Sequence, residues 1–191
     1  MSKLATMGNE KLIRRGFALS DGDSEADHER IMGSSNTVCK KFNICGNNGH
    51  HIGFVMDQSV QSIIILFSLA RMRISVSLFE TDQSMLEYMN AMDHAKITLW
   101  IVPDSLSNFH LNGYIRTYSD LLVPGNELKM NVTRGYLKLL TSGTTGIKKL
   151  VMHSYASIEQ EGEIYRRTFS LSSSDKIMST VPLNYMYGLT G

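Results

Sequence analysis

Apolar residues in the middle of the chain follow two spacings, and each spacing predicts one type of element. Short apolar runs at residues 52–56 and 97–102 are typical of buried strands. Between them Ile74, Val76 and Leu78 alternate with serines, which is the period of two that a strand shows. The sequence therefore predicts three strands in this region.

Helical spacing fills the two gaps between these strands. Apolar residues recur every three or four positions after Ser59 as far as residue 70, and again after Ser84 at Met85, Met89 and Met92. Each serine can cap a helix, because its hydroxyl accepts a hydrogen bond from an amide of the first turn. Alternating strands and helices predict right-handed crossovers, and so an α/β fold with a mainly parallel sheet.

The second half of the chain is less regular. Residues 104–135 are weakly patterned, and we predict no element there. Residues 136–140 predict a strand and residues 148–152 a short return strand, after which Ser154 can cap a helix. Residues 176–181 predict one more strand.

The beginning of the chain differs from the rest in composition. Residues 1–30 are charged and short of large apolar side chains. We therefore expect residues 1–35 to form a polar tail or a loosely packed start, because such segments bury too little apolar surface to offset the entropy of ordering. Residues 36–191 are expected to form the folded part.

Charge and hydropathy exclude several classes of function. Lys and Arg number 19 and Asp and Glu 18, so the net charge of +1 steers the protein toward neither nucleic acid nor anionic lipid. The longest apolar run, residues 63–69, is shorter than the roughly 20 residues that span a bilayer. Cys39 and Cys45 fit neither a CxxC pair nor a four-ligand zinc site. We expect a soluble, cytoplasmic protein with reduced thiols.

Histidines offer one alternative site. His50 and His51 are adjacent, with His94, His110 and His153 elsewhere, but no HExxH or other paired spacing occurs. Solvated histidines explain this scatter better than metal ligands do. No metal site is therefore expected from protein side chains.

Glycines, hydroxyls and lysines are concentrated directly after the strand at 136–140. Glycines let the backbone approach a ligand and point successive amides at one cluster of oxygens, while hydroxyls and a lysine add donors and charge. The spacing is not that of a Walker loop, because two residues separate the glycines and no hydroxyl follows the lysines. The candidate polyphosphate-binding residues are Thr141, Ser142, Gly143, Thr144, Thr145, Gly146 and Lys149.

A longer string gives this loop a family resemblance. Residues 140–155, LTSGTTGIKKLVMHSY, resemble the phosphate-loop signature of the adenylate-forming superfamily, TSGTTG-x-PKG-V-x-x-SH. That superfamily holds acyl- and aryl-CoA synthetases, peptide-synthetase adenylation domains and luciferases. Residues 181–189, VPLNYMYGL, look like its next motif, and residues 52–101 are similar to its early α/β unit. The resemblance makes residues 36–191 a partial adenylation domain from the N-terminal part of such an enzyme.

The resemblance implies a reaction and its participants. The family activates a carboxylic acid with ATP and Mg²⁺ as an acyl-adenylate, and transfers the acyl group to CoA or to a carrier-protein thiol. By the resemblance, the loop holds the β- and γ-phosphates and Lys149 is a mobile catalytic charge. Tyr185 is the second catalytic candidate, because it falls where the family places an aromatic residue or histidine beside the reacting carboxylate; Asn184 takes that place if the register of the motif shifts by one residue.

Several positions depart from the family pattern. Lys148 stands where the family has proline, which should loosen the exit of the loop because proline pre-sets φ. Leu150 replaces a glycine, and Tyr155 replaces the usual histidine. The sequence also stops at Gly191, before the family's adenine, magnesium, ribose and C-terminal lysine motifs. The chain alone is therefore expected to lack full activity.

Two hypotheses on function follow. The second motif lacks the Phe-Asp-x-Ser type of string that peptide-synthetase domains carry, which favours a fatty or aryl acid over an amino acid. In the alternative hypothesis the chain is a non-catalytic split subunit or binding module. Either form would need the remainder of the adenylation domain or a complementing chain to adenylate an acid.

Overall fold

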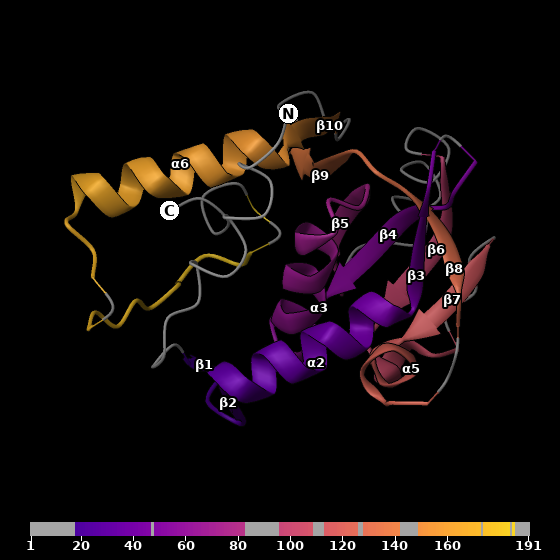
Figure 1. Ribbon diagram of the computed structural model, residues 1–191, viewed down its shortest axis with the longest axis horizontal. Helices are drawn as coiled ribbons and strands as arrows, with labels where there is room; N and C mark the ends of the chain where they lie inside the picture. Colours follow the sequence, from indigo (N-terminus) through magenta and orange to yellow (C-terminus); the bar gives the residue numbers. More distant parts are fainter. Residues whose placement is uncertain are drawn as a thin grey trace.

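The main sheet has six strands, in the order β10-β9-β5-β4-β6-β7 (Figure 1). The computed structural model describes residues 18–46, 48–82, 96–108, 113–125, 128–141, 149–172, 174–183 and 185. Five strands are parallel, and β10 alone in this sheet is antiparallel to its neighbour. The strands are β4 His51–Met56, β5 Val76–Glu80, β6 Ile97–Val102, β7 Tyr114–Thr117, β9 Tyr136–Thr141 and β10 Lys149–Ser154. The prediction of a mainly parallel α/β fold is confirmed.

Three helices cover one face of this sheet: α2 His28–Lys40, α3 Val60–Arg71 and α5 Tyr118–Leu122 (Figure 1). Ser59 caps α3 as the sequence predicts, since its side chain accepts a hydrogen bond from the Ser62 amide. Alternate residues of the strands, such as Phe54 and Leu78, pack with the helices in the larger core cluster. Burial of this face supplies most of the apolar stabilisation of the fold.

The opposite face of the sheet carries a smaller aromatic core. Val55, Phe79 and Trp100 are buried there, and the Phe79 and Trp100 ring centroids lie 5.1 Å apart. Gly53 lies beneath the Trp100 ring so closely that a Cβ atom would stand 2.5 Å from it. The absence of a side chain at Gly53 therefore lets the indole pack flat against β4.

The chain is ordered earlier than the sequence suggested. Strands β1 Ala18–Ser20 and β2 Glu25–Asp27 pair antiparallel, and α2 follows at once with Asp27 as its N-cap. Ile31 and Val38 of α2 are buried, although the helix is otherwise polar. The expected boundary at residue 35 falls within α2, which the sequence analysis did not predict because its apolar stripe is so narrow.

Short elements also occupy the weakly patterned region. A 3-10 turn, η1 Asp104–Leu106, follows β6, and β7 and α5 come after it. Strand β8 Met130–Thr133 pairs in parallel with β3 Phe42–Cys45 to form a separate two-stranded sheet. Strands of four residues give too few alternations for periodicity to reveal them.

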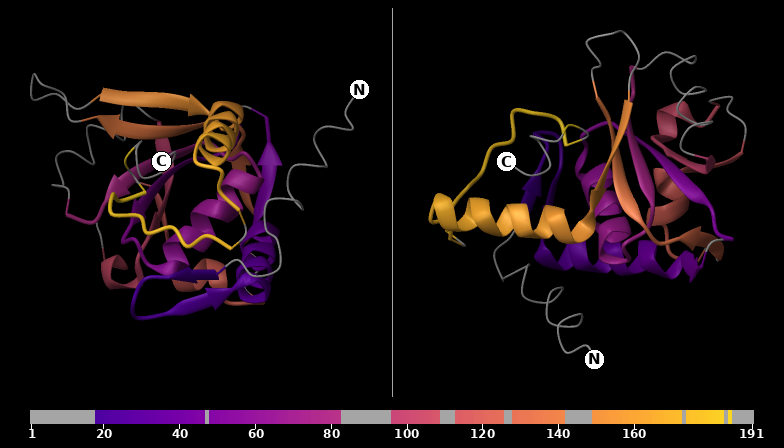
Figure 2. Two further views of the ribbon diagram at one scale, coloured as in Figure 1. Left: turned by 90° about the vertical axis from the view of Figure 1, so that its left-hand side faces the viewer. Right: turned by 90° about the horizontal axis from the view of Figure 1, so that it is seen from above.

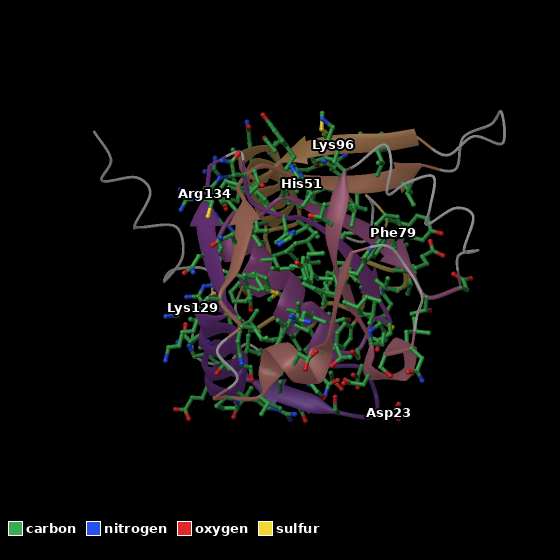
Figure 3. The ribbon with its side chains drawn as sticks, turned by 90° about the vertical axis from the view of Figure 1, so that its right-hand side faces the viewer. Asp23, His51, Phe79, Lys96, Lys129 and Arg134 are labelled. Atoms are coloured by element: carbon green, nitrogen blue, oxygen red, sulfur yellow. The ribbon has the colours of Figure 1, made fainter. Side chains whose placement is uncertain are left out.

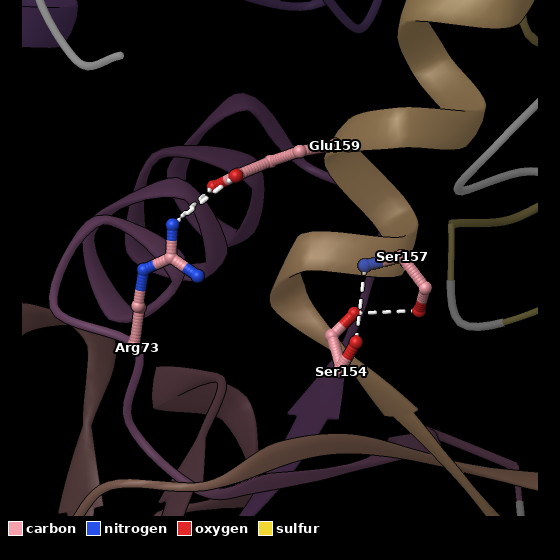
Figure 4. A network of polar contacts seen from close by, with 4 residues as sticks. All are labelled: Arg73, Ser154, Ser157 and Glu159. Carbon is pink, nitrogen blue, oxygen red and sulfur yellow. Dashed lines mark hydrogen bonds and ion pairs between the residues drawn. The ribbon is translucent and has the colours of Figure 1, made fainter. Parts of the chain in front are cut away.

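Helix α6, Tyr155–Thr168, joins the rest of the fold through its first turns (Figure 2). Ser154 caps it by accepting from the Ser157 amide, and the Tyr155 hydroxyl donates to the carbonyl of Ile74. Arg73 pairs with Glu159 at 3.0 Å (Figure 4). Tyr155 is the one residue of α6 that is fully buried, so most of the helix surface faces solvent.

The strand predicted at residues 176–181 is wrong, because residues 175–180 have no regular structure. Ile177 is 70% exposed and Met178 86% exposed. A strand needs a neighbour to pair its amides and carbonyls, and no described strand lies beside this segment. The helix predicted after Ser84 lies outside the described residues.

Candidate functional site

The candidate site lies where the parallel strands end. Strand β4 ends at Met56 and is followed by Asp57 and Gln58, while β5 ends at Glu80 and β9 at Thr141. Because these strands are parallel, their carboxyl ends lie along one edge of the sheet. Ligands of open α/β sheets bind at this edge, where the connecting loops present side chains and backbone groups.

The hairpin of β9 and β10 brings the two ends of the candidate phosphate loop together. Thr141 and Lys149 form the last register pair of the hairpin. Ser142, Gly143, Thr144, Thr145 and Gly146, along with Lys148, lie outside the described residues. The backbone positions of Thr141 and Lys149 therefore place the start and end of the loop at the carboxyl edge.

Tyr185 reaches the same edge from the C-terminal segment. Its amide donates to the carbonyl of Pro182 at 3.0 Å, which closes a turn. Hydrogen bonding to the nearby Glu80 carboxylate raises the pKa of Tyr185, and burial and the negative charges of Glu80 and Asp82 raise it further. Tyr185 is 40% exposed, so its ring remains accessible to a ligand.

Glu80 and Thr141 end neighbouring parallel strands. Leu78 of β5 pairs with Leu139 of β9 as the last pair of their ladder, and Glu80 and Thr141 each stand two residues further along their strands. Tyr185, which is close enough to Glu80 for that carboxylate to affect its pKa, therefore lies at the same edge of the sheet as Thr141.

Gln58 and Glu80 are site residues that the sequence analysis missed. The Gln58 side-chain oxygen accepts a hydrogen bond from the Leu183 amide at 2.9 Å, so it holds the segment that carries Tyr185. A signal for both was available, because each lies at or just beyond the end of a predicted strand. Only the register across the sheet shows that they face the second motif.

Charge is distributed unevenly between the two edges of the sheet. Described acidic residues gather at the carboxyl ends of the strands, where Asp57, Glu80, Asp82 and Asp104 lie. Such an edge repels a polyphosphate unless cations offset the charge. Lys149 begins β10 at this edge and is one candidate for that cation.

His50, His51 and His153 lie toward the other edge of the sheet, and His94 and His110 lie outside the described residues. His51 begins β4 and lies close to Lys96, which precedes β6 (Figure 3). Burial lowers the pKa of His51, and the positive charges of Lys138 and Lys96 lower it further. His50 contacts the Thr98 hydroxyl at 2.8 Å. Positive neighbours oppose binding of a metal cation, and within the described ranges no cluster of three His, Cys, Asp or Glu side chains fits a metal ion.

Two further features concern the cysteines and the length and hydropathy of the helices. Cys39 and Cys45 are free and partly buried, and burial raises the pKa of the Cys39 thiol. In the part of the chain that the structure describes, no helix is both long and apolar enough to cross a membrane.

Solved structures resemble this chain over most of its length, although no family model matches it. ATP-bound MatB from Rhodopseudomonas palustris superposes with a TM-score of 0.68 over 87% of this chain at 14% identity. The nonribosomal peptide synthetase FmoA3 bound to α-methyl-L-serine-AMP gives 0.69 over 88% at 9% identity. The o-succinylbenzoate CoA synthetase MenE from Bacillus subtilis, in complex with its acyl-adenylate intermediate, gives 0.68 over 88% at 12% identity.

The chain has the fold of adenylate-forming enzymes. It corresponds to their N-terminal subdomain, as the resemblance of residues 140–155 implied. The chain spans 37% of MatB, 19% of the FmoA3 chain and 47% of MenE. At identities of 9–14% the likeness establishes the adenylate-forming fold alone.

Proposed function

We propose that this chain carries the phosphate-binding part of an enzyme that activates a carboxylic acid with ATP. The observation that supports the proposal is the β9–β10 hairpin, which pairs Thr141 and Lys149, the two ends of the string, at the carboxyl edge of an adenylate-forming fold. MatB with bound ATP and MenE with a bound acyl-adenylate share that fold. An acceptor thiol, from CoA or a carrier protein, completes the proposed reaction.

The proposed reaction depends more on stabilising negative charge on the phosphate oxygens than on covalent bonds to the protein. A carboxylate oxygen of the substrate forms a bond to the α-phosphorus of ATP, and the bond from that phosphorus to the bridging oxygen breaks. Pyrophosphate leaves with the electron pair, and negative charge develops on phosphate oxygens. Amides and hydroxyls of residues 141–146 would hold the β- and γ-phosphates, with Lys149 as a mobile positive charge.

Tyr185 would line the place where the carboxylate meets the α-phosphate. The Tyr185 side chain is 40% exposed, so it remains accessible to a ligand beside Glu80. Mg²⁺ would accompany ATP and offset the charge of the acidic edge. Magnesium needs only one or two carboxylates besides phosphate oxygens and water, and we assign it no ligand in this chain.

The proposed substrate class is a fatty or aryl acid. Residues 181–189 lack the Phe-Asp-x-Ser type of string that peptide-synthetase domains carry, and this absence is the feature that favours a fatty or aryl acid. Pyrophosphate exchange across a panel of acids, using the full-length form, tests this choice. A clear preference for an α-amino acid would refute it.

A second candidate function is that of a complementing, non-catalytic subunit. The observation in its favour is the exposed segment around Ile177 and Met178, which offers apolar surface to another chain. In this case the chain would bind nucleotide weakly and acquire turnover only with its partner.

One experiment tests whether the chain is an enzyme by itself. The purified 191-residue chain is incubated with ATP, Mg²⁺ and a panel of acids, and AMP and acyl-adenylate are quantified. We expect weak ATP binding without turnover, because losing one transition-state donor already costs roughly 10²–10³ in rate. Turnover by a monomer, abolished in the Lys149→Ala variant, would show that the chain is an enzyme by itself.

A further inference from the structure

The turn that carries Tyr185 is held by Gln58, the second residue after β4. Residues 175–180, which lead to the turn from α6, have no regular structure. The chain before the turn therefore does not determine where Tyr185 lies. The contact that does so is the hydrogen bond from the Leu183 amide to the side-chain oxygen of Gln58.

Hydrogen bonds of the neighbouring residues hold the backbone around Gln58 in place. Asp57 accepts hydrogen bonds from the amide of Ser59 at 3.0 Å and from its hydroxyl at 2.6 Å. The next amide, of Val60, donates to Asp21 at 2.7 Å. Hydrogen bonds thus connect the backbone on both sides of Gln58 to α3 and to the β1–β2 turn. They restrict the position from which the Gln58 side chain extends.

The backbone of Gln58 is in a disfavoured conformation. Its φ is +63°, in the left-handed region that glycine and asparagine tolerate better than glutamine. Strained non-glycine residues cluster at functional sites, where surrounding contacts hold them in place. Here the contact is the hydrogen bond to Leu183, a residue 125 positions further along the chain.

We propose that Gln58 is a positioning residue of the candidate adenylation site, because its side-chain oxygen fixes the 182–185 turn and so sets where Tyr185 lies beside Glu80. The inference rests on the proposed function for the meaning of the site, but the contact itself exists without it. Leu183 also packs, partly buried, against the larger core, so the turn joins the core to the site.

Three substitutions test this role. Gln58→Gly removes the side-chain amide and relieves the backbone, Gln58→Ala removes the side-chain amide but keeps the disfavoured backbone conformation, and Gln58→Glu keeps an acceptor of similar reach. We expect the Leu183 amide to exchange with solvent roughly tenfold faster in the glycine and alanine variants, as the loss of one hydrogen bond implies. The Tyr185 ring signals should shift in the same two variants, and Gln58→Glu should restore both readouts.

Stability separates positioning from general structural support. The unfolding midpoint of Gln58→Gly should equal or exceed that of the wild type, since glycine accepts a positive φ. Unchanged Leu183 exchange or unchanged Tyr185 signals in Gln58→Gly would overturn the inference, as would failure of Gln58→Glu to restore them. Failure of the wild type to bind ATP in calorimetry would instead count against the proposed function, because the exchange readouts need no nucleotide.

Discussion

Among single residues, Lys149 carries the clearest consequence for nucleotide binding. It opens β10 opposite Thr141, at an edge where Glu80 and Asp82 are negative. A charge-assisted hydrogen bond contributes about 1.5–3 kcal/mol, so Lys149→Ala should weaken ATP binding by roughly tenfold or more. Calorimetry on both forms measures the change.

Lys138→Ala is the matched control for this prediction. Lys138 lies on the same hairpin and pairs with Met152, three residues before Thr141 on β9. Both variants lose one positive charge, but only Lys149 stands at the loop. Equal ATP affinities of the wild type and Lys149→Ala, or equal losses in the two variants, would contradict the assignment of the loop.

Tyr155 predicts a pH dependence of stability. Its hydroxyl donates to the carbonyl of Ile74, and burial raises its pKa above the ordinary value of 10.0. The native state therefore holds this proton more tightly than the unfolded chain does. The resulting stability is complete below pH 10 and is lost as the pH rises toward the native pKa.

Tyr155→Phe should accordingly lower the stability at neutral pH but weaken the decline of stability at alkaline pH. At neutral pH it should lower the free energy of unfolding by about 1–3 kcal/mol, because the buried Ile74 carbonyl loses its partner. Above pH 10 its stability should decline less steeply than that of the wild type. Denaturant titrations from neutral to alkaline pH test both effects, with Tyr136→Phe, at a side chain that is 48% exposed, as the control. Parallel pH profiles for wild type and Tyr155→Phe would disprove the explanation.

At the scale of elements, two glycines should respond in opposite directions to the same substitution. Gly53→Ala places a Cβ 2.5 Å from the Trp100 ring, which is fully buried and cannot move aside. Overpacking of this kind costs about 1–3 kcal/mol. Gly162, within α6, has no atom within 4 Å of such a Cβ, and alanine there should stabilise the helix by about 0.5–1 kcal/mol.

Thermal unfolding of the two alanine variants measures this contrast. The midpoint should fall for Gly53→Ala and rise slightly for Gly162→Ala. A stable Gly53→Ala variant would mean that β4 and β6 adjust more easily than the packing of Trp100 implies.

For the whole molecule, exposed apolar side chains predict association. Phe169 is 63% exposed, and Ile177 and Met178 more so. Contiguous apolar surface of this kind marks protein interfaces or aggregation-prone sites. We expect sedimentation to reveal concentration-dependent self-association, which Ile177→Asp together with Met178→Asp should reduce without lowering the unfolding midpoint. A wild-type chain that remains monomeric at all concentrations would show that these exposed apolar side chains do not mediate self-association.

The sequence predicted the centre of the fold well and its periphery poorly. The bounds of β6 and the Ser59 and Ser154 caps were predicted correctly because apolar runs and capping serines are local signals. Helix α2 was missed, and a strand at residues 176–181 was wrongly predicted. In both places the outcome depends on contacts with distant residues, which a local pattern does not contain.

For the candidate site, too, local features were predictable from the sequence, whereas contacts between distant residues were not. The sequence alone was enough to predict a polyphosphate-binding loop at residues 141–149 and to propose Tyr185 as a candidate, since glycines, hydroxyls and a family-like string are properties of the chain itself. Tertiary structure alone decided that Gln58 and Glu80 meet the second motif. Parallel strands align their carboxyl ends through crossovers, so residues more than a hundred positions apart become neighbours at one edge.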